Sequence, residues 1–135
     1  MSLSPTRAYT WIASIGLFLQ GGSTLAAQLV PGIDHAMPML LEESRMIPSH
    51  SLLHIASGLI GFAALRSGGM ATWLFALGFG TFYVALAIVG IRSGLPLGIG
   101  LQPFDHSFHA VLGGFGLLAA AIESLRFRAT SRSDA

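Results

Sequence analysis

The sequence predicts an all-α integral membrane protein: a four-helix bundle made of two duplicated helical hairpins. Three observations lead to this fold class. Of the 135 residues, 53% are hydrophobic and 10% are charged, whereas a soluble domain averages about 25% charged residues. Four long stretches contain no Asp, Glu, Lys or Arg. No strand-like alternation of polar and apolar residues is present, so helices are the expected spanning elements.

Turn residues separate the four apolar stretches, and a helix needs roughly 20 mostly apolar residues to cross a membrane. Pro31 ends the first stretch, and Pro48 starts the second, where the missing N–H of proline costs nothing. The segment 67–69 connects the second stretch to the third, and glycines and prolines within 94–103 precede the fourth. We expect the polar tail, 126–135, to be frayed. The expected spans of this single transmembrane domain (residues 1–135) are 8–30, 49–65, 70–91 and 105–125.

Composition excludes several function classes. Seven basic and six acidic residues leave a formal net charge of +1, so the clustered cations that bind nucleic acid are missing. The chain has no cysteine, which excludes a disulfide framework, a thiolate metal site and a cysteine nucleophile. No nucleophile motif or phosphate-binding loop occurs, so we expect no catalytic residues and no enzyme activity.

Arginines are distributed unevenly between the two ends of the predicted bundle. Four spans place both termini and the 67–69 turn on one side, and the positive-inside rule assigns this side to the cytoplasm. It carries Arg7, Arg66, Arg126, Arg128 and Arg132, against Arg45 and Arg92 on the other side. The extracytoplasmic side then holds all five histidines: His35, His50, His54, His106 and His109.

The two halves of the chain repeat each other. A shift of 55 positions lays the second span on the fourth and places His54 on His109; a shift of 62 lays the first on the third and places Trp11 on Trp73. Both halves run in the same direction, which predicts a pseudo-twofold axis along the membrane normal. The glycines that match are Gly58 with Gly113 and Gly61 with Gly116.

Both copies read His-x-x-x-Gly-x-x-Gly, which puts the histidine and the glycines on one helical face. Small residues let helices approach closely in lipid, and an ionisable group is expected to face the bundle interior. We therefore expect these four glycines to be helix-packing residues. We also expect the second and fourth helices to contact each other, with His54 and His109 close together.

The starts of the second and fourth helices share a short pattern. The two segments are Leu53-His54-x-x-x-Gly58 and Asp105-His106-x-x-His109-x-x-x-Gly113. Over most of its length the chain thereby resembles a family of uncharacterised bacterial four-helix membrane proteins, a domain of unknown function. Phe108 stands where that family usually has leucine, and His50 and His106 are additional imidazoles. The resemblance implies the fold, the topology and a bacterial cytoplasmic membrane, but no reaction.

Five residues at these helix starts are candidate metal ligands: His50, His54, Asp105, His106 and His109. Spacings of i, i+4 and i, i+3 put each pair of imidazoles on one side of its helix, and zinc and copper accept imidazole ligands. The positive end of the helix dipole favours the neutral, ligating form. The alternative interpretation is a structural role in capping or in contacts between the two repeats.

His54 and His109 alone also suit the axial positions of a haem b. In that interpretation the glycines below them leave room for the macrocycle. All histidines lie at one face, so at most one haem would fit. The alternative is a packed, glycine-rich interface between helices.

Other patterns are better explained without a ligand. His35, Met37 and Met39 would suit Cu(I), but we interpret this segment as an apolar loop at the interface. Glu123 can pair with Arg126 one turn later, and the inner half otherwise lacks the ionisable path of a proton relay. Five rings of the third helix suit packing against other helices or pigment-like ligands, and the alternative is contact with lipid: Trp73, Phe75, Phe79, Phe82 and Tyr83.

Small size, short loops and glycine-rich faces favour a non-catalytic accessory or scaffold subunit of a larger membrane complex. The expected partners are other transmembrane subunits or copies of this chain, together with lipid, and no cofactor is expected. The alternative is a protein that binds a divalent metal or haem b through His54 and His109 at the extracytoplasmic face.

Overall fold

The computed structural model describes residues 3–30, 32–36, 46–93 and 100–133. Within these ranges all regular structure is helical, as four long helices and one short one. They are α1 (Pro5–Leu29), α2 (Ile33–Ala36), α4 (Pro48–Ser67), α5 (Gly69–Ser93) and α6 (Pro103–Ser133). The predicted all-α four-helix fold is confirmed.

Proline and glycine set the limits of these helices. Pro5, Pro48 and Pro103 begin α1, α4 and α6, because proline has the right φ for a first turn and needs no hydrogen-bond acceptor there. Gly68 alone separates α4 from α5 and has φ 111°. That left-handed backbone favours glycine and allows the chain to reverse between two consecutive long helices.

The end of α6 differs from the prediction. We expected the segment 126–135 to fray, but the helix continues to Ser133, and residues 134–135 lie outside the described residues. Residues 126–133 contain neither glycine nor proline, so nothing in them interrupts helical hydrogen bonding. The other long helices begin and end within a few residues of the expected spans.

Three of the long helices are long and apolar enough to cross a membrane. They are Pro5–Leu29, Gly69–Arg92 and Pro103–Ala129. α4 has 20 residues, which matches the thickness of a bilayer core, but its histidines and serines lower its mean hydropathy. A membrane crossing by α4 therefore stays a prediction.

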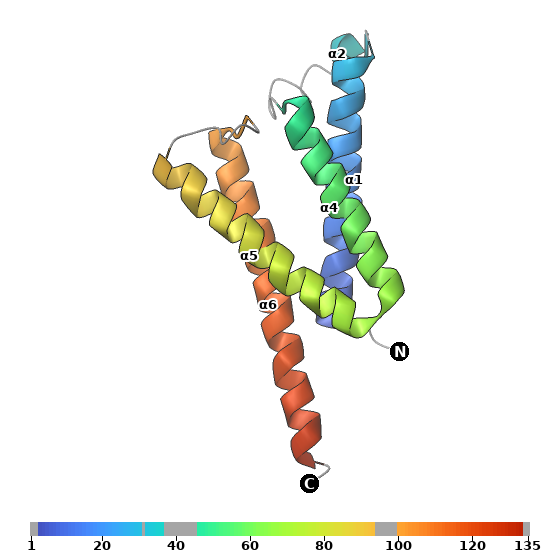
Figure 1. The fold of residues 1–135 in the computed structure, drawn as a ribbon, viewed down its shortest axis with the longest axis vertical. Helices are drawn as coiled ribbons and strands as arrows, with labels where there is room; N and C mark the ends of the chain where they lie inside the picture. The colour runs from blue at the N-terminus through green and yellow to red at the C-terminus, as the bar shows by residue number, and fades with distance from the viewer. Residues whose placement is uncertain (1–2, 31, 37–45, 94–99, 134–135) are drawn as a thin grey trace.

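Two hairpins make up the bundle (Figure 1). α1 pairs with α4 and α5 pairs with α6, and these are the two most extensive helix contacts. Both termini lie toward one end, with the turn between α4 and α5. We call the opposite end, with α2 and the start of α6, the loop end. The hairpins thus point in the same direction, as the repeat predicts.

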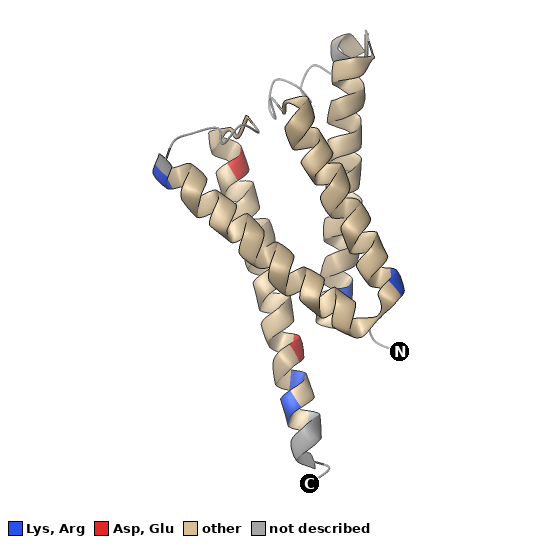
Figure 2. Ribbon diagram, viewed as in Figure 1, with Lys and Arg blue, Asp and Glu red and all other residues tan. Residues whose placement is uncertain are grey.

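The described arginines gather mainly at the end opposite the loop end (Figure 2). Arg7 lies in the first turn of α1, and Arg66 lies in the last turn of α4. Arg126 and Arg128 follow on the C-terminal part of α6, whereas Arg92 lies at the loop end of α5. The charged side chains thus flank a bundle whose middle is almost free of charge.

Polar side chains lie inside the bundle and large apolar ones lie outside. The fully buried polar residues include Thr6, Thr10, Ser14, Thr24 and Thr72. The exposed apolar residues include Ile12, Leu19, Ile60, Met70 and Val111. This arrangement suits a protein surrounded by lipid, because lipid is as apolar as leucine while buried hydroxyls need protein partners.

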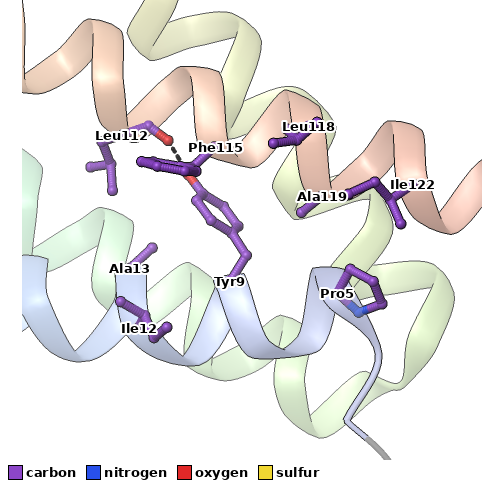
Figure 3. A pocket seen from close by; sticks show the side chains of 9 residues that line it. All are labelled: Pro5, Tyr9, Ile12, Ala13, Leu112, Phe115, Leu118, Ala119 and Ile122. Atoms are coloured by element: carbon purple, nitrogen blue, oxygen red, sulfur yellow. Dashed lines mark hydrogen bonds between the residues drawn. The ribbon is translucent and has the colours of Figure 1, made fainter.

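An apolar groove of about 410 Å³ runs between α1 and α6 on this surface (Figure 3). The hydroxyl of Tyr9 donates a hydrogen bond to the carbonyl oxygen of Leu112 at 3.1 Å, across the groove. The other lining residues are apolar: Pro5, Ile12, Ala13, Phe115, Leu118, Ala119 and Ile122.

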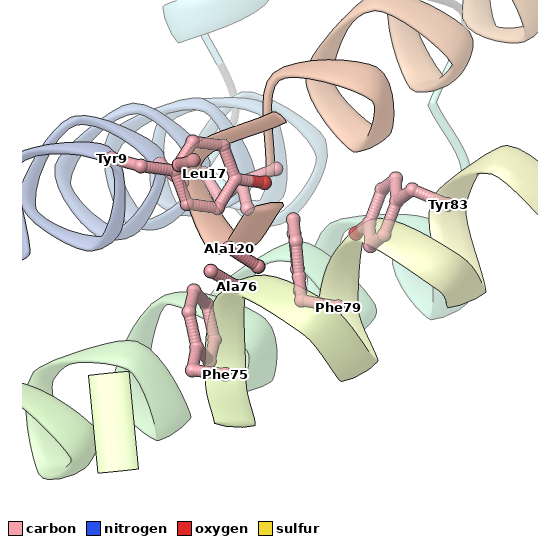
Figure 4. Packing of buried hydrophobic residues seen from close by; sticks show 9 residues of the cluster. Tyr9, Leu17, Phe75, Ala76, Phe79, Tyr83 and Ala120 are labelled. Atoms are coloured by element: carbon pink, nitrogen blue, oxygen red, sulfur yellow. The ribbon is translucent and has the colours of Figure 1, made fainter. Parts of the chain in front are cut away.

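A stack of three rings from α5 fills the core (Figure 4). Phe75 and Phe79 lie 4.9 Å apart between ring centroids, and Phe79 and Tyr83 lie 4.2 Å apart. All three are buried in a cluster with residues of α1 and α6, so they pack against other helices and do not contact lipid. Spacing of four residues places them on one face of α5, and that face points inward.

The glycines of the repeat face their hairpin partners. A Cβ at Gly58 would lie 2.8 Å from the carbonyl oxygen of Ser14 in α1, and one at Gly113 would lie 2.7 Å from that of Gly80 in α5. Both distances are too short for a real Cβ, so glycine is needed for the close approach. The expected contact between the second and fourth helices is confined to side chains, because α4 and α6 are not among the extensively contacting pairs while His54 of α4 and His109 of α6 have ring centroids 5.9 Å apart.

Candidate metal site

Three histidines from both hairpins converge near the loop end. His50 and His54 lie in the first two turns of α4, and His109 lies in the second turn of α6. Although α4 and α6 make little backbone contact, their side chains meet in the space between the hairpins. The rings of His54 and His109 have centroids 5.9 Å apart.

The cluster formed by His50, His54 and His109 is compact and fully enclosed. Ring centroids of His50 lie 4.6 Å from those of His54 and 5.7 Å from those of His109. One nitrogen from each of the three rings lies within 4.8 Å of the other two. The three residues are 0–1% exposed.

None of the six ring nitrogens in this cluster has a hydrogen-bond partner among the described residues. Buried polar groups in proteins are nearly always hydrogen-bonded, and an unpaired one costs about 1–3 kcal/mol. Three adjacent imidazoles in this condition are unusual. A single metal ion coordinated by one nitrogen of each ring would give all three rings a partner.

The separation of the nitrogens fits such an ion. Imidazole nitrogens bind zinc at about 2.0–2.1 Å in a tetrahedral arrangement, which places two ligand nitrogens of one ion about 3.3 Å apart. The three nitrogens lie within 4.8 Å of one another, so binding requires side-chain movements that close the longest of these separations by up to about 1.5 Å.

Asp105 lies at the edge of the cluster and is 3% exposed. Its Oδ2 is 4.0 Å from Nδ1 of His50, too far for a hydrogen bond. The same oxygen accepts the backbone N–H of Gln102 at 2.7 Å, which caps the start of α6. Asp105 is therefore not one of the three groups that converge, but it is next to one of them.

The remaining candidate ligands lie elsewhere. His106 packs against Gly90 of α5 and does not join the cluster, because its position on α6 turns it toward the neighbouring helix. His35 is exposed in α2. Met37 and Met39 lie outside the described residues.

Aromatic and hydroxyl groups surround the cluster. The ring of Tyr83 meets the ring of His109 edge to face, with centroids 4.8 Å apart. Its hydroxyl lies 3.5 Å from the hydroxyl of Ser57. Thr24 and Ser51 bond to each other at 2.9 Å between α1 and α4. These contacts fix the walls of the site without using the imidazole nitrogens.

The geometry does not favour a haem. In that interpretation Gly58 and Gly113 leave space for the macrocycle below His54 and His109. In the structure this space is filled, since the backbone of Ser14 lies against Gly58 and the backbone of Gly80 lies against Gly113. A porphyrin would require the two helices of each hairpin to separate.

A second buried polar site was not expected from the sequence. Oε2 of Glu123 accepts the backbone N–H of Thr6 at 3.0 Å and its hydroxyl at 2.6 Å. The hydroxyls of Thr6 and Thr72 lie 3.3 Å apart. Glu123 also has the expected electrostatic interaction with Arg126 on its own helix. No local sequence pattern indicates the partner 117 residues away.

No protein family, curated protein sequence or solved structure matches this chain. The fold and the site together define it as a helical protein with membrane-spanning features and a buried three-histidine cluster.

Proposed function

We propose that this protein binds one transition metal ion inside the membrane, through His50, His54 and His109. One observation carries the proposal: three fully buried imidazoles bring nitrogens within 4.8 Å of one another, and none of these nitrogens is hydrogen-bonded among the described residues. A purely structural role would be expected to pair at least some of them.

The donor set indicates the class of ion. Imidazole suits zinc, copper, iron and nickel, whereas magnesium and calcium take oxygen ligands. The chain has no cysteine, so thiolate cannot contribute. We propose a first-row transition metal, with zinc and copper the best matched.

We further propose that the loop end faces away from the cytoplasm of a bacterial cell, in the cytoplasmic membrane. Support comes from the charges: Arg7, Arg66, Arg126 and Arg128 lie at the opposite end, against Arg92 at the loop end. A reporter enzyme fused to the C-terminus tests this orientation. A reporter that functions only in the cytoplasm should be active at this position. Activity of a reporter that functions only outside the cytoplasm would contradict the proposal.

Two further statements stay predictions: that the protein is a subunit of a larger complex, and that it belongs to the uncharacterised four-helix family. The groove between α1 and α6 would accept a lipid chain or a partner helix equally well, so it supports neither over the other. Purification in a series of detergents, from mild to stronger, would test for a complex. A subunit of a complex should co-purify with its partner proteins in a fixed stoichiometry.

Metal binding is tested on the full chain, purified in mild detergent and treated with a chelator. The protein is then titrated with Zn²⁺ or Cu²⁺, and bound metal is measured by elemental analysis after desalting. We expect one equivalent in the unaltered protein and none in the double variant His54→Ala, His109→Ala. His35→Ala and His106→Ala are matched controls that should keep the metal, because neither side chain belongs to the cluster.

Two results would contradict the proposal. One is equal metal content in the unaltered protein and in the double variant. The other is an unaltered, folded protein that retains neither Zn²⁺ nor Cu²⁺. An absorption spectrum of the gently purified protein, oxidised and reduced, tests haem separately, because a bound haem would give a Soret band.

A further inference from the structure

The repeat relates Asp105 to a member of the cluster. The shift of 55 positions that places His54 on His109 also places His50 on Asp105. In each hairpin the two positions are four residues apart, on one helical face. The first hairpin thus presents two imidazoles, and the second presents a carboxylate and an imidazole at the equivalent places.

This equivalence holds in three dimensions. Gly58 of α4 lies against Phe18 of α1, and Gly113 of α6 lies against Gly80 of α5. Phe18 and Gly80 are equivalent under the shift of 62 positions. The helices of the two hairpins therefore pack in the same register, so positions 50 and 105 are related by the same rotation as positions 54 and 109.

Each equivalent pair also meets across the gap between the hairpins. The rings of His54 and His109 have centroids 5.9 Å apart, and Nδ1 of His50 lies 4.0 Å from Oδ2 of Asp105. Residues related by a twofold axis can contact each other only near that axis. The cluster and Asp105 therefore surround the pseudo-twofold axis at the loop end.

We propose that Asp105 is the positioning carboxylate of the metal site, the pseudo-symmetric counterpart of His50. This role rests on the proposed metal function. With the ion bound, Nδ1–H of His50 donates to Oδ2 of Asp105, and Nε2 of His50 is the ligand atom. Metal-bound histidines commonly donate their second N–H to a carboxylate, which fixes the ring and its tautomer. The 4.0 Å distance between Nδ1 of His50 and Oδ2 of Asp105 has to shorten by about 1 Å to become a hydrogen bond.

The surroundings of Asp105 suit a carboxylate. The backbone N–H of Gln102 donates to the same oxygen at 2.7 Å, and the start of α6 contributes the positive end of its dipole. A negative charge here offsets part of the cost of holding a cation among neutral imidazoles in a medium of low dielectric constant.

The test is a Co²⁺ titration of the full-length protein in detergent, followed by visible absorption. Three proteins are compared: the unaltered chain, Asp105→Asn, and the exchange variant His50→Asp, Asp105→His. Glu123→Gln, which alters a buried carboxylate at the other end of α6, is the matched control. Asparagine keeps an oxygen that can accept the N–H of Gln102, so the helix cap survives in Asp105→Asn.

We expect Asp105→Asn to bind Co²⁺ about 10- to 100-fold more weakly, the usual effect of losing such a carboxylate, with a shifted visible spectrum. If Asp105 only caps α6, the variant should change neither the Co²⁺ affinity nor the visible spectrum. Because the two positions are equivalent, the exchange variant should recover most of the lost affinity. Glu123→Gln should bind like the unaltered protein.

The outcomes separate this inference from the proposed function. Unchanged affinity and spectrum in Asp105→Asn would overturn the role of Asp105 and leave the metal site standing. A folded exchange variant that binds no better than Asp105→Asn would overturn the equivalence. If the exchange variant does not fold, Asp105→Asn alone decides. An unaltered, folded protein that takes up neither Co²⁺ nor Zn²⁺ nor Cu²⁺ would overturn both proposals.

Discussion

Glu123 in α6 caps the first turn of α1 through Thr6. Its Oε2 accepts both the backbone N–H and the hydroxyl of Thr6, at 3.0 and 2.6 Å. The first N–H groups of a helix have no acceptor within it, and the apolar part of a membrane offers no water to replace one. The contact therefore joins the start of the chain to its last helix and satisfies both groups together.

Replacing this carboxylate should destabilise the fold. In Glu123→Ala the N–H and hydroxyl of Thr6 lose their acceptor, and we expect unfolding to become easier by about 1–3 kcal/mol. The free energy of unfolding can be measured by denaturant titration in mixed micelles. Arg128→Ala, an exposed position on the same helix, is the control. Equal stability of the two variants would show that the contact contributes nothing.

Glycine at positions 58 and 113 should be needed for hairpin packing. Alanine at either place puts a Cβ within 2.7–2.8 Å of a backbone oxygen of the partner helix, and overpacking of this kind costs about 1–3 kcal/mol. Gly114→Ala is the matched control, because no atom lies within 4 Å of its Cβ position. It should be neutral or stabilising, since alanine favours helix. If all three variants unfold alike, the close approach is not essential.

Tyr83 should matter for its ring more than for its hydroxyl. The ring is fully buried and stacks on Phe79 at 4.2 Å between centroids, so Tyr83→Ala should cost about 3–5 kcal/mol of stability, as for other large aromatic truncations. Tyr83→Phe keeps the ring and loses only a long contact with Ser57. A folded Tyr83→Phe protein with most of its stability is expected; equal losses in both variants would place the importance on the hydroxyl.

Metal should stabilise the folded protein if the cluster binds it. A ligand present at 100 times its Kd adds about 2.7 kcal/mol when it binds only the native state. We expect Zn²⁺ to raise the thermal unfolding temperature of the unaltered protein in detergent. The variant His54→Ala, His109→Ala should not respond. An equal rise in both proteins would indicate binding at other groups.

Part of the site could be predicted because its residues repeat. His54 and His109 occur at equivalent places, and the expectation that they lie close together agrees with their rings 5.9 Å apart. His50 and His106 were equally plausible ligands by helical spacing. Only the way each helix is rotated against its neighbours turns His50 into the cluster and His106 onto Gly90.

The aromatic rings of α5 show why hydrophobic periodicity does not predict which face of a membrane helix is buried. Phe75, Phe79 and Phe82 are all apolar, yet the first two are buried and Phe82 is exposed. In water, polar residues would mark the exposed face of a helix. In lipid both faces are apolar, so the sequence carries little information about which face points inward.

The sequence by itself determined the class of fold, the approximate ends of the helices and the repeat of two hairpins. These follow from local properties: apolar length, the φ of proline and glycine, and the spacing of identical residues. Only the tertiary structure decided that the repeat glycines face their hairpin partners, that Glu123 caps α1, and that three histidines converge. These relationships depend on the rotation and crossing of helices far apart in the chain, which result from side-chain packing over the whole bundle.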